Sequence, residues 1–149
     1  AEAACAASGL PAIADDSGLC IDFLNGEPGL HSARFNQQVK TFGRTGGIEA
    51  ILELMAGVPH EKRGAHFFCA AVFLEDPDSY HVCTGKLEGF IAESPRGQGG
   101  FGYDPIFLFN ESQTLAQVSN EIKNSFSHRA HAFNKLASFI GLQSRLSDK

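Results

Sequence analysis

The chain lacks the features that would point to a membrane, to export or to nucleic acid. No stretch of its 149 residues is apolar over the length of a membrane span, and no positive cluster precedes an apolar run at its start. Positive charge is also scarce. The formal net charge is −5 at pH 7, whereas binding along a nucleic-acid backbone depends on clustered lysines and arginines. We therefore expect neither membrane insertion, nor export, nor a nucleic-acid partner.

Closely spaced cysteines are missing as well. Four cysteines are scattered along the chain without a Cys-x-x-Cys pair, at Cys5, Cys20, Cys69 and Cys83. The last two lie within apolar runs that resemble strands. We expect reduced, largely buried thiols, which suits a cytoplasmic protein.

What the chain does contain is enough apolar material for one core. Hydrophobic residues make up 43% of it, including 13 phenylalanines. We find no internal repeat, low-complexity tract or linker. The sequence therefore predicts a single domain over residues 1–149.

Local patterns predict both helices and strands, and so an α/β protein. Helices are expected over residues 1–8, from Gly47 to about residue 57, weakly over 115–126, and from an N-cap at Ser127 onward. Strands are expected over residues 12–14 and 19–24 on either side of an acidic turn, over 65–74 and 80–91 as an antiparallel pair, and over 106–109.

The segment Gly97–Pro105 contains four glycines around two aromatic residues and an aspartate. Glycine loses the most conformational entropy on ordering, so such a cluster suits backbone that must approach a flat or anionic ligand or adopt positive φ. Phe101 and Tyr103 could stack on a base, and Asp104 could accept from its ring N–H or amino groups. The alternative is a tight turn before the next strand.

Two polar clusters also have two interpretations each. Asp15 and Asp16 are adjacent at a predicted strand end, so their side chains should point to opposite faces and only one should enter a given cleft. That one could hold Mg²⁺ together with phosphate oxygens, or both could simply belong to a turn. His128 and Arg129 open a helix, where exposed N–H groups favour anions or carbonyl oxygens; the alternative is a capped helix with solvated side chains.

Four motifs occur in order, at residues 14–19, 29–35, 99–105 and 127–130. With them the chain resembles the inosine/xanthosine triphosphate pyrophosphatase (Ham1-like) family, which hydrolyses non-canonical purine nucleoside triphosphates. The match runs from Leu10 into the last helix. The resemblance implies an α/β fold in which an elongated mixed sheet is flanked by helices, with a nucleotide cleft between two lobes.

The resemblance also implies a reaction and a site. The reaction is the Mg²⁺-dependent hydrolysis of ITP, dITP or XTP to the monophosphate and pyrophosphate, in an enzyme that is commonly a homodimer. Asp16 matches the catalytic base and metal-associated carboxylate, and we leave Asp15 in a supporting role and Arg34 and Arg96 unassigned. Substrate contacts are expected from Ser17, Phe101, Gly102, Tyr103, Asp104, Lys123, His128 and Arg129.

Within that set, two contacts have a specific chemistry. Donors at His128 and Arg129 suit the 6-oxo group of hypoxanthine or xanthine and would meet the 6-amino group of adenine donor to donor. Lys123 is a point charge suited to phosphate, although a lone lysine is more often a solvated surface charge.

The chain also departs from the family pattern. The family's first strand, its Ser/Thr-Gly-Asn loop with a lysine, and a glutamate on the next helix do not occur in these residues. By resemblance we therefore expect a chain that is truncated at its N-terminus relative to the family. We expect it to supply part of an active site, to hydrolyse ITP slowly by itself, and to self-associate through an open sheet edge.

Two other functions stay open at this point. The first is a nucleotide-binding module or inactive remnant without the triphosphate clamp. The second is a serine hydrolase using Ser17, His128 and an aspartate, although Ser17 does not lie in a Gly-x-Ser-x-Gly turn.

Overall fold

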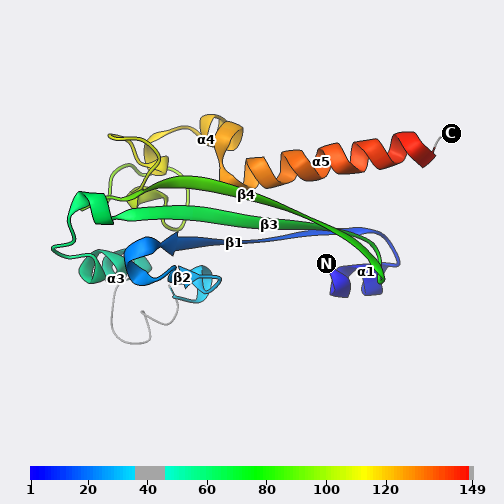
Figure 1. Cartoon of the computed structure of the whole chain (residues 1–149), viewed down its shortest axis with the longest axis horizontal. Helices are drawn as coiled ribbons and strands as arrows, with labels where there is room; N and C mark the ends of the chain where they lie inside the picture. Colours follow the sequence, from blue (N-terminus) through cyan, green and yellow to red (C-terminus); the bar gives the residue numbers. More distant parts are fainter. Residues whose placement is uncertain (36–45, 148–149) are drawn as a thin grey trace.

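The computed structural model describes residues 1–35 and 46–147, with side chains up to residue 141. Its centre is a long, curved sheet with the strand order β2-β1-β3-β4-β5, in which every described pair is antiparallel (Figure 1). The strands are β1 (Ala12–Ile21), β2 (Pro28–Gly29), β3 (Gly64–Asp76), β4 (Ser79–Ile91) and β5 (Phe107–Leu108). The helices are α1 (Glu2–Ser8), α3 (Gly47–Leu54), α4 (Asn120–Phe126) and α5 (His128–Ser147), with short 3₁₀ turns η1 (Asp22–Leu24), η2 (His60–Lys62), η3 (Asp104–Ile106) and η4 (Leu115–Gln117).

The α/β class and most of the expected elements are confirmed. α1 ends at Gly9, which adopts the left-handed conformation typical of a helix C-terminus. β3 and β4 form the expected hairpin, although both strands are longer than the pattern indicated. The expected strand over 106–109 is reduced to the two residues of β5, because η3 occupies the positions before it.

The acidic segment of β1 differs from the expectation. We expected two short strands around an acidic turn, but β1 runs without interruption through Asp15 and Asp16, which pair with Ala71 and Ala70 of β3. Continuous ladder hydrogen bonds to β3 outweigh the weak strand propensity of aspartate. Side chains alternate along a regular strand, so the two carboxylates leave β1 towards opposite faces of the sheet. Both residues nevertheless line the same cleft, whereas we expected only one to enter it.

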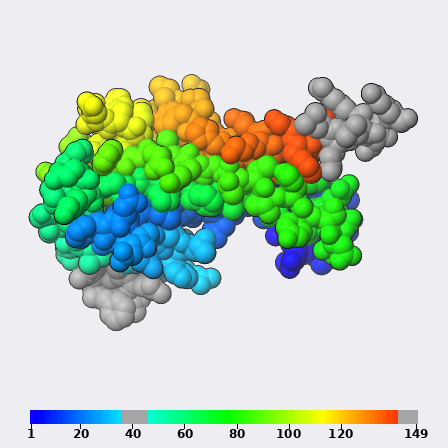
Figure 2. Space-filling model, in the orientation of Figure 1, coloured from blue at the N-terminus to red at the C-terminus, as the bar shows by residue number. Residues whose placement is uncertain are grey.

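These two faces carry different helices. α5 lies along one face, over β3 and β4, while α1 packs on the other (Figure 1, Figure 2). On the α5 face, Ala132 and Leu136 pack against Cys69, Ala71 and Cys83. Phe133 of the same helix is 37% exposed, because the helix presents its Ala132–Leu136 side to the sheet.

Gly85 of β4 allows the first turn of α5 to approach the sheet. A Cβ atom at this position would lie 2.0 Å from the carbonyl oxygen of His128 and 2.6 Å from the nitrogen of Ala132. No side chain fits there. The start of α5 therefore lies almost directly on the backbone of β4.

The largest core cluster contains residues of the strands β1, β3, β4 and β5, of α3 and the segment after it, and of the segments on either side of β5. Within it, the guanidinium of Arg63 is buried and donates to the carbonyl oxygens of Met55, Val58, Ile91 and Ala92 at 2.7–3.3 Å. Arg63 thus joins the segment after α3 to the end of β4.

We expect Arg63→Ala to lower the free energy of unfolding by about 3 kcal/mol or more, because four buried carbonyl groups lose a charged donor and each such bond contributes about 1.5–3 kcal/mol. Arg96 is the matched control, since it is exposed and its side chain makes one hydrogen bond to the described part of the chain, from Nη1 to the carbonyl of Ser112. Arg96→Ala should cost about 1 kcal/mol or less. Urea denaturation of both variants measures this, and equal losses would contradict the role given to Arg63.

Candidate active site

A cleft of about 440 Å³ opens where the middle of β1, the glycine-rich loop and the start of α5 meet. Every site residue assigned from the resemblance lines this cleft, except Lys123. The lining residues are Asp15, Asp16, Ser17, Gly18, Leu19, Ser32, Ala33, Phe67, Phe101, Gly102, Tyr103, Asp104, His128 and Arg129. Segments from both ends of the chain therefore meet at one place.

The two acids of β1 have different partners. Asp16 is exposed, and its Oδ1 accepts the backbone N–H of Ser17 at 2.9 Å. The side chain of Asp15 is 22% exposed, and its Oδ2 accepts from Nε of Arg129 in α5 at 2.8 Å. The Ser17 hydroxyl lies 3.5 Å from the same Oδ2. Of the two, Asp16 is the carboxylate without an ion-pair partner among the described residues.

Asp104 organises the glycine-rich loop from inside. Its buried carboxylate accepts the N–H of Phe101 at 2.8 Å and the ammonium of Lys123 at 2.5 Å. Gly100 adopts φ +71°, and a Cβ atom there would lie 2.0 Å from Asp104 Oδ2. Glycine is thus required where the loop closes over this carboxylate. Asp104 and Lys123, which we expected to contact base and phosphate separately, are bonded to each other.

The two aromatic residues of this loop are placed differently. Tyr103 is buried in the main core, where its hydroxyl donates to the carbonyl of Ser32 at 2.8 Å and burial raises its pKa to about 12. Phe101 is 64% exposed. Its ring lies 4.3 Å from Nζ of Lys123 and 5.9 Å from Cζ of Arg129. Phe101 therefore offers a ring face to a ligand, while Tyr103 forms part of the wall.

His128 lies at the start of α5, which Ser127 caps by accepting the N–H of Ala130 at 3.1 Å. The imidazole is 5% exposed and stacks on Phe67 with ring centroids 4.8 Å apart. Its Nδ1 is buried and has no hydrogen-bond partner within the described part of the chain. Burial lowers the pKa of His128 to about 4, and the charge of Arg129 acts in the same direction. The ring is therefore neutral at pH 7.

The sequence reasoning did not assign five of the cleft residues, namely Gly18, Leu19, Ser32, Ala33 and Phe67, and two of these have contacts that shape the site. Ser32 accepts the N–H of Leu19 at 2.9 Å and donates to the carbonyl of Gly29 at 2.6 Å, which ties the second motif to β1. Its place within residues 29–35 was the available signal. Phe67, on which His128 stacks, gave none, because it reads as an ordinary strand residue. Of the unassigned arginines, neither Arg34 nor Arg96 lines the cleft.

The serine-hydrolase alternative gains no support from this geometry. Ser17 and His128 both line the cleft, but no hydrogen bond joins them among the described residues, and the Ser17 hydroxyl lies beside Asp15. Ser17 is also within a regular strand and not at a sharp turn.

The donor set around the cleft fits one kind of metal site. Nowhere in residues 1–35 and 46–147 do three or more His, Cys, Asp or Glu side chains gather as they would around a resident ion. Mg²⁺, however, is commonly held by one or two carboxylates together with substrate phosphates and water. Exposed Asp16 suits an ion that enters with a polyphosphate. No helix in the described part of the chain is long and apolar enough to cross a membrane.

We expect the buried imidazole to make the protein sensitive to acid. As pH falls from 6.5 towards 4, the unfolded chain takes up a proton that folded His128 does not, so stability should fall by on the order of 3 kcal/mol. His128→Gln should lack this part of the loss. Urea denaturation between pH 7.5 and 4 compares the two, and an NMR titration of the His128 ring near pH 6.5 would contradict the expectation.

Comparisons with protein families, curated proteins and solved structures give one consistent result. The Ham1 family model matches residues 1–139. The chain is 45% identical over 145 residues to the dITP/XTP pyrophosphatase of Streptomyces coelicolor, covering 94% of this chain and 70% of that protein. It is 46% identical to the dITP/XTP pyrophosphatase of Geobacillus kaustophilus, covering 91% and 66%. The solved structure of the Staphylococcus aureus Ham1 protein superposes with a TM-score of 0.82 at 37% identity, covering 95% of this chain and 72% of that one. The chain belongs to the Ham1 family.

Proposed function

We propose that this protein hydrolyses non-canonical purine nucleoside triphosphates, namely ITP, dITP and XTP, to the monophosphate and pyrophosphate. The observation that carries the proposal is the cleft, whose lining combines exposed Asp16 of β1, the exposed ring of Phe101 and the polar residues His128 and Arg129 at the start of α5. The relatives named dITP/XTP pyrophosphatase support it. We further propose that residues 1–149 act as one domain, in a cytoplasmic homodimer.

Base recognition would take place between Phe101 and the start of α5. The exposed ring of Phe101 offers a stacking face, and Arg129 together with neutral His128 offers donors to a 6-oxo group. Adenine presents an amino group at that position, so the same donors would stay unpaired. We keep Asp104 and Lys123 in the substrate-binding set because together they hold Phe101 in place. Ser17, Gly102 and Tyr103 complete the set as cleft residues.

Hydrolysis would take place at the β1 side of the cleft. We assign Asp16 as the general base, which accepts a proton from the water that attacks the α-phosphate. When bound, Mg²⁺ would neutralise charge on the triphosphate, with Asp16 and phosphate oxygens among its ligands. Asp15 is not suited to the role of base, since Arg129 already occupies its Oδ2.

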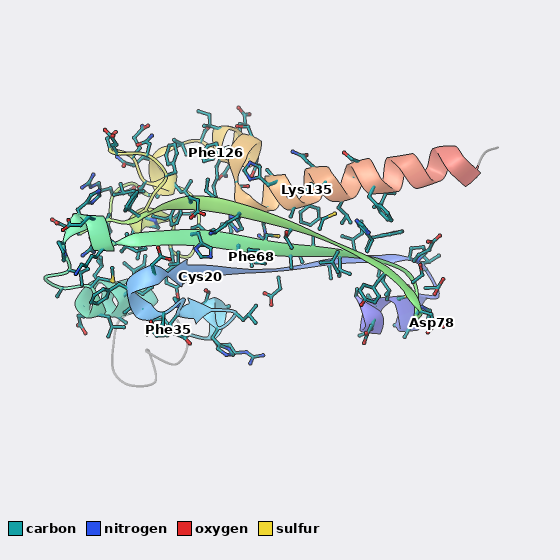
Figure 3. All side chains as sticks on the ribbon, in the orientation of Figure 1. Cys20, Phe35, Phe68, Asp78, Phe126 and Lys135 are labelled. Carbon is teal, nitrogen blue, oxygen red and sulfur yellow. The ribbon has the colours of Figure 1, made fainter. Side chains whose placement is uncertain are left out.

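We expect Asp16→Asn to lower kcat for dITP by about 10²-fold to 10⁴-fold, the usual contribution of a general base, while IMP binding is retained. Pyrophosphate release with Mg²⁺ and calorimetric binding of IMP measure the two effects. Asp78 is the matched control, because it lies at the far tip of the β3–β4 hairpin (Figure 3). Asp78→Asn should leave both unchanged.

Two outcomes would go against this assignment. Turnover by Asp16→Asn within a few-fold of wild type would place the catalytic carboxylate elsewhere. A wild-type protein that binds IMP and dITP but releases no pyrophosphate would favour the nucleotide-binding module instead of the enzyme.

Arg129→Ala should reduce selectivity more than it reduces overall activity. Loss of a donor to the 6-oxo group weakens the binding of ITP and changes the binding of ATP little. The ratio of kcat/KM for ITP to that for ATP should therefore fall about tenfold. Lys135→Ala is the control on the same helix, because Lys135 donates to the carbonyl of Thr84 outside the cleft (Figure 3). An unchanged ratio with uniformly weaker kcat/KM would make Arg129 a phosphate or structural contact.

A further inference from the structure

The ion pair between Asp15 and Arg129 separates two hollows. On one side is the cleft described above. On the other is an open hollow of about 370 Å³, lined by Asp15, Asn124, Ser127, Arg129, Ala130 and Phe133. Both hollows share only Asp15 and Arg129. The two side chains therefore form the partition between them.

Arg129 has few other contacts that would fix its direction. Its side chain is 46% exposed, and among the described residues its side chain makes one hydrogen bond, from Nε to Asp15 Oδ2. The ring of Phe101, 5.9 Å from Cζ, is a weaker neighbour. An exposed arginine without its carboxylate partner regains its rotamer freedom, and here the second hollow lies open to it.

We propose that Asp15 is a positioning residue that sets the base selectivity of the cleft by holding Arg129. This rests on the proposed function. Because the Asp15 carboxylate binds Nε of Arg129, the two Nη groups are left to donate hydrogen bonds to a ligand. The guanidinium is planar, so these two donors keep a fixed geometry relative to each other. Such a pair of donors matches the two acceptors on the edge of a 6-oxopurine, O6 and N7. Adenine instead places a donor beside N7.

The location of Asp15 supports this assignment over a catalytic one. Its carboxylate is bound by Arg129 of α5, whereas Asp16 lines the same cleft without an ion-pair partner among the described residues. A role of Asp15 in stability alone is also poorly supported, because partly exposed ion pairs contribute little to the free energy of folding. Removing Asp15 should therefore change selectivity much more than stability.

The test compares Asp15→Ala, Asp15→Asn and wild type for kcat and KM with dITP and dATP. Asp15→Ala should raise KM for dITP and lower the dITP/dATP ratio of kcat/KM about tenfold, with kcat within a few-fold. Asp15→Asn should give a ratio between those of Asp15→Ala and wild type, since its amide oxygen still accepts the hydrogen bond from Arg129 but carries no charge. Glu88→Gln, which breaks the surface pair with Lys86, should change nothing.

A double-mutant cycle of Asp15 and Arg129 distinguishes the positioning of Arg129 by Asp15 from a general structural effect. If Asp15 acts through Arg129, the variant Asp15→Ala/Arg129→Ala should be no less selective than Arg129→Ala alone. Additive losses would overturn the proposal. A fall in kcat at unchanged selectivity would also overturn it, and would place Asp15 in the chemistry. Thermal unfolding of Asp15→Asn close to that of wild type confirms that the comparison is made on folded protein.

A readout independent of hydrolysis distinguishes failure of this proposal from failure of the proposed function. In ¹⁵N-labelled protein the Arg129 Nε–Hε signal should be protected from exchange in wild type and lose that protection in Asp15→Ala. IMP should bind more tightly than AMP, and this preference should shrink in the same variant.

If no dITP is hydrolysed but these changes occur, only the proposed function fails. If dITP is hydrolysed but they do not occur, only the role of Asp15 fails. If the wild type neither binds IMP nor hydrolyses dITP, both fail.

Discussion

The close approach of α5 to β4 is the constraint on which the site depends. Because Gly85 has no side chain, the first turn of the helix lies against the strand backbone, and His128 reaches Phe67 on the neighbouring strand. From the same turn Arg129 reaches across to Asp15 on β1. A larger residue at position 85 would lift the helix and separate all of these contacts at once. Site geometry is thus set by backbone packing, and the side chains follow from it.

Because side chains alternate along β1, the adjacent acids Asp15 and Asp16 have different surroundings and different proposed roles. Asp15 is bound by Arg129 of α5, whereas Asp16 leaves the strand in the other direction and has no ion-pair partner among the described residues. A turn at this point would not separate them so reliably, because its side chains have no fixed alternation. The continuous strand is therefore better suited to the two roles than the turn we expected.

Local features of this fold could be predicted from sequence, and long-range ones could not. The β3–β4 hairpin and the cap at Ser127 follow from turn formers and apolar spacing within a few residues. The family motifs found nearly all the cleft residues. No local signal, however, shows that Asp104 bonds Lys123 or that His128 stacks on Phe67, since these contacts depend on tertiary packing. The prediction of an acidic turn at Asp15 and Asp16 was wrong for the same reason, because pairing with β3 determines the backbone conformation there.

The charges of the cleft suggest how a polyanion could be accommodated. Each cation near the cleft already has a carboxylate: Lys123 pairs with Asp104, and Arg129 with Asp15. His128 is neutral because its burial lowers its pKa. What remains uncompensated among the described cleft residues is Asp16, which would repel a triphosphate. A base can thus be selected by hydrogen bonds alone, whereas the phosphates need additional positive charge beside Asp16, and this is where the proposed Mg²⁺ would act.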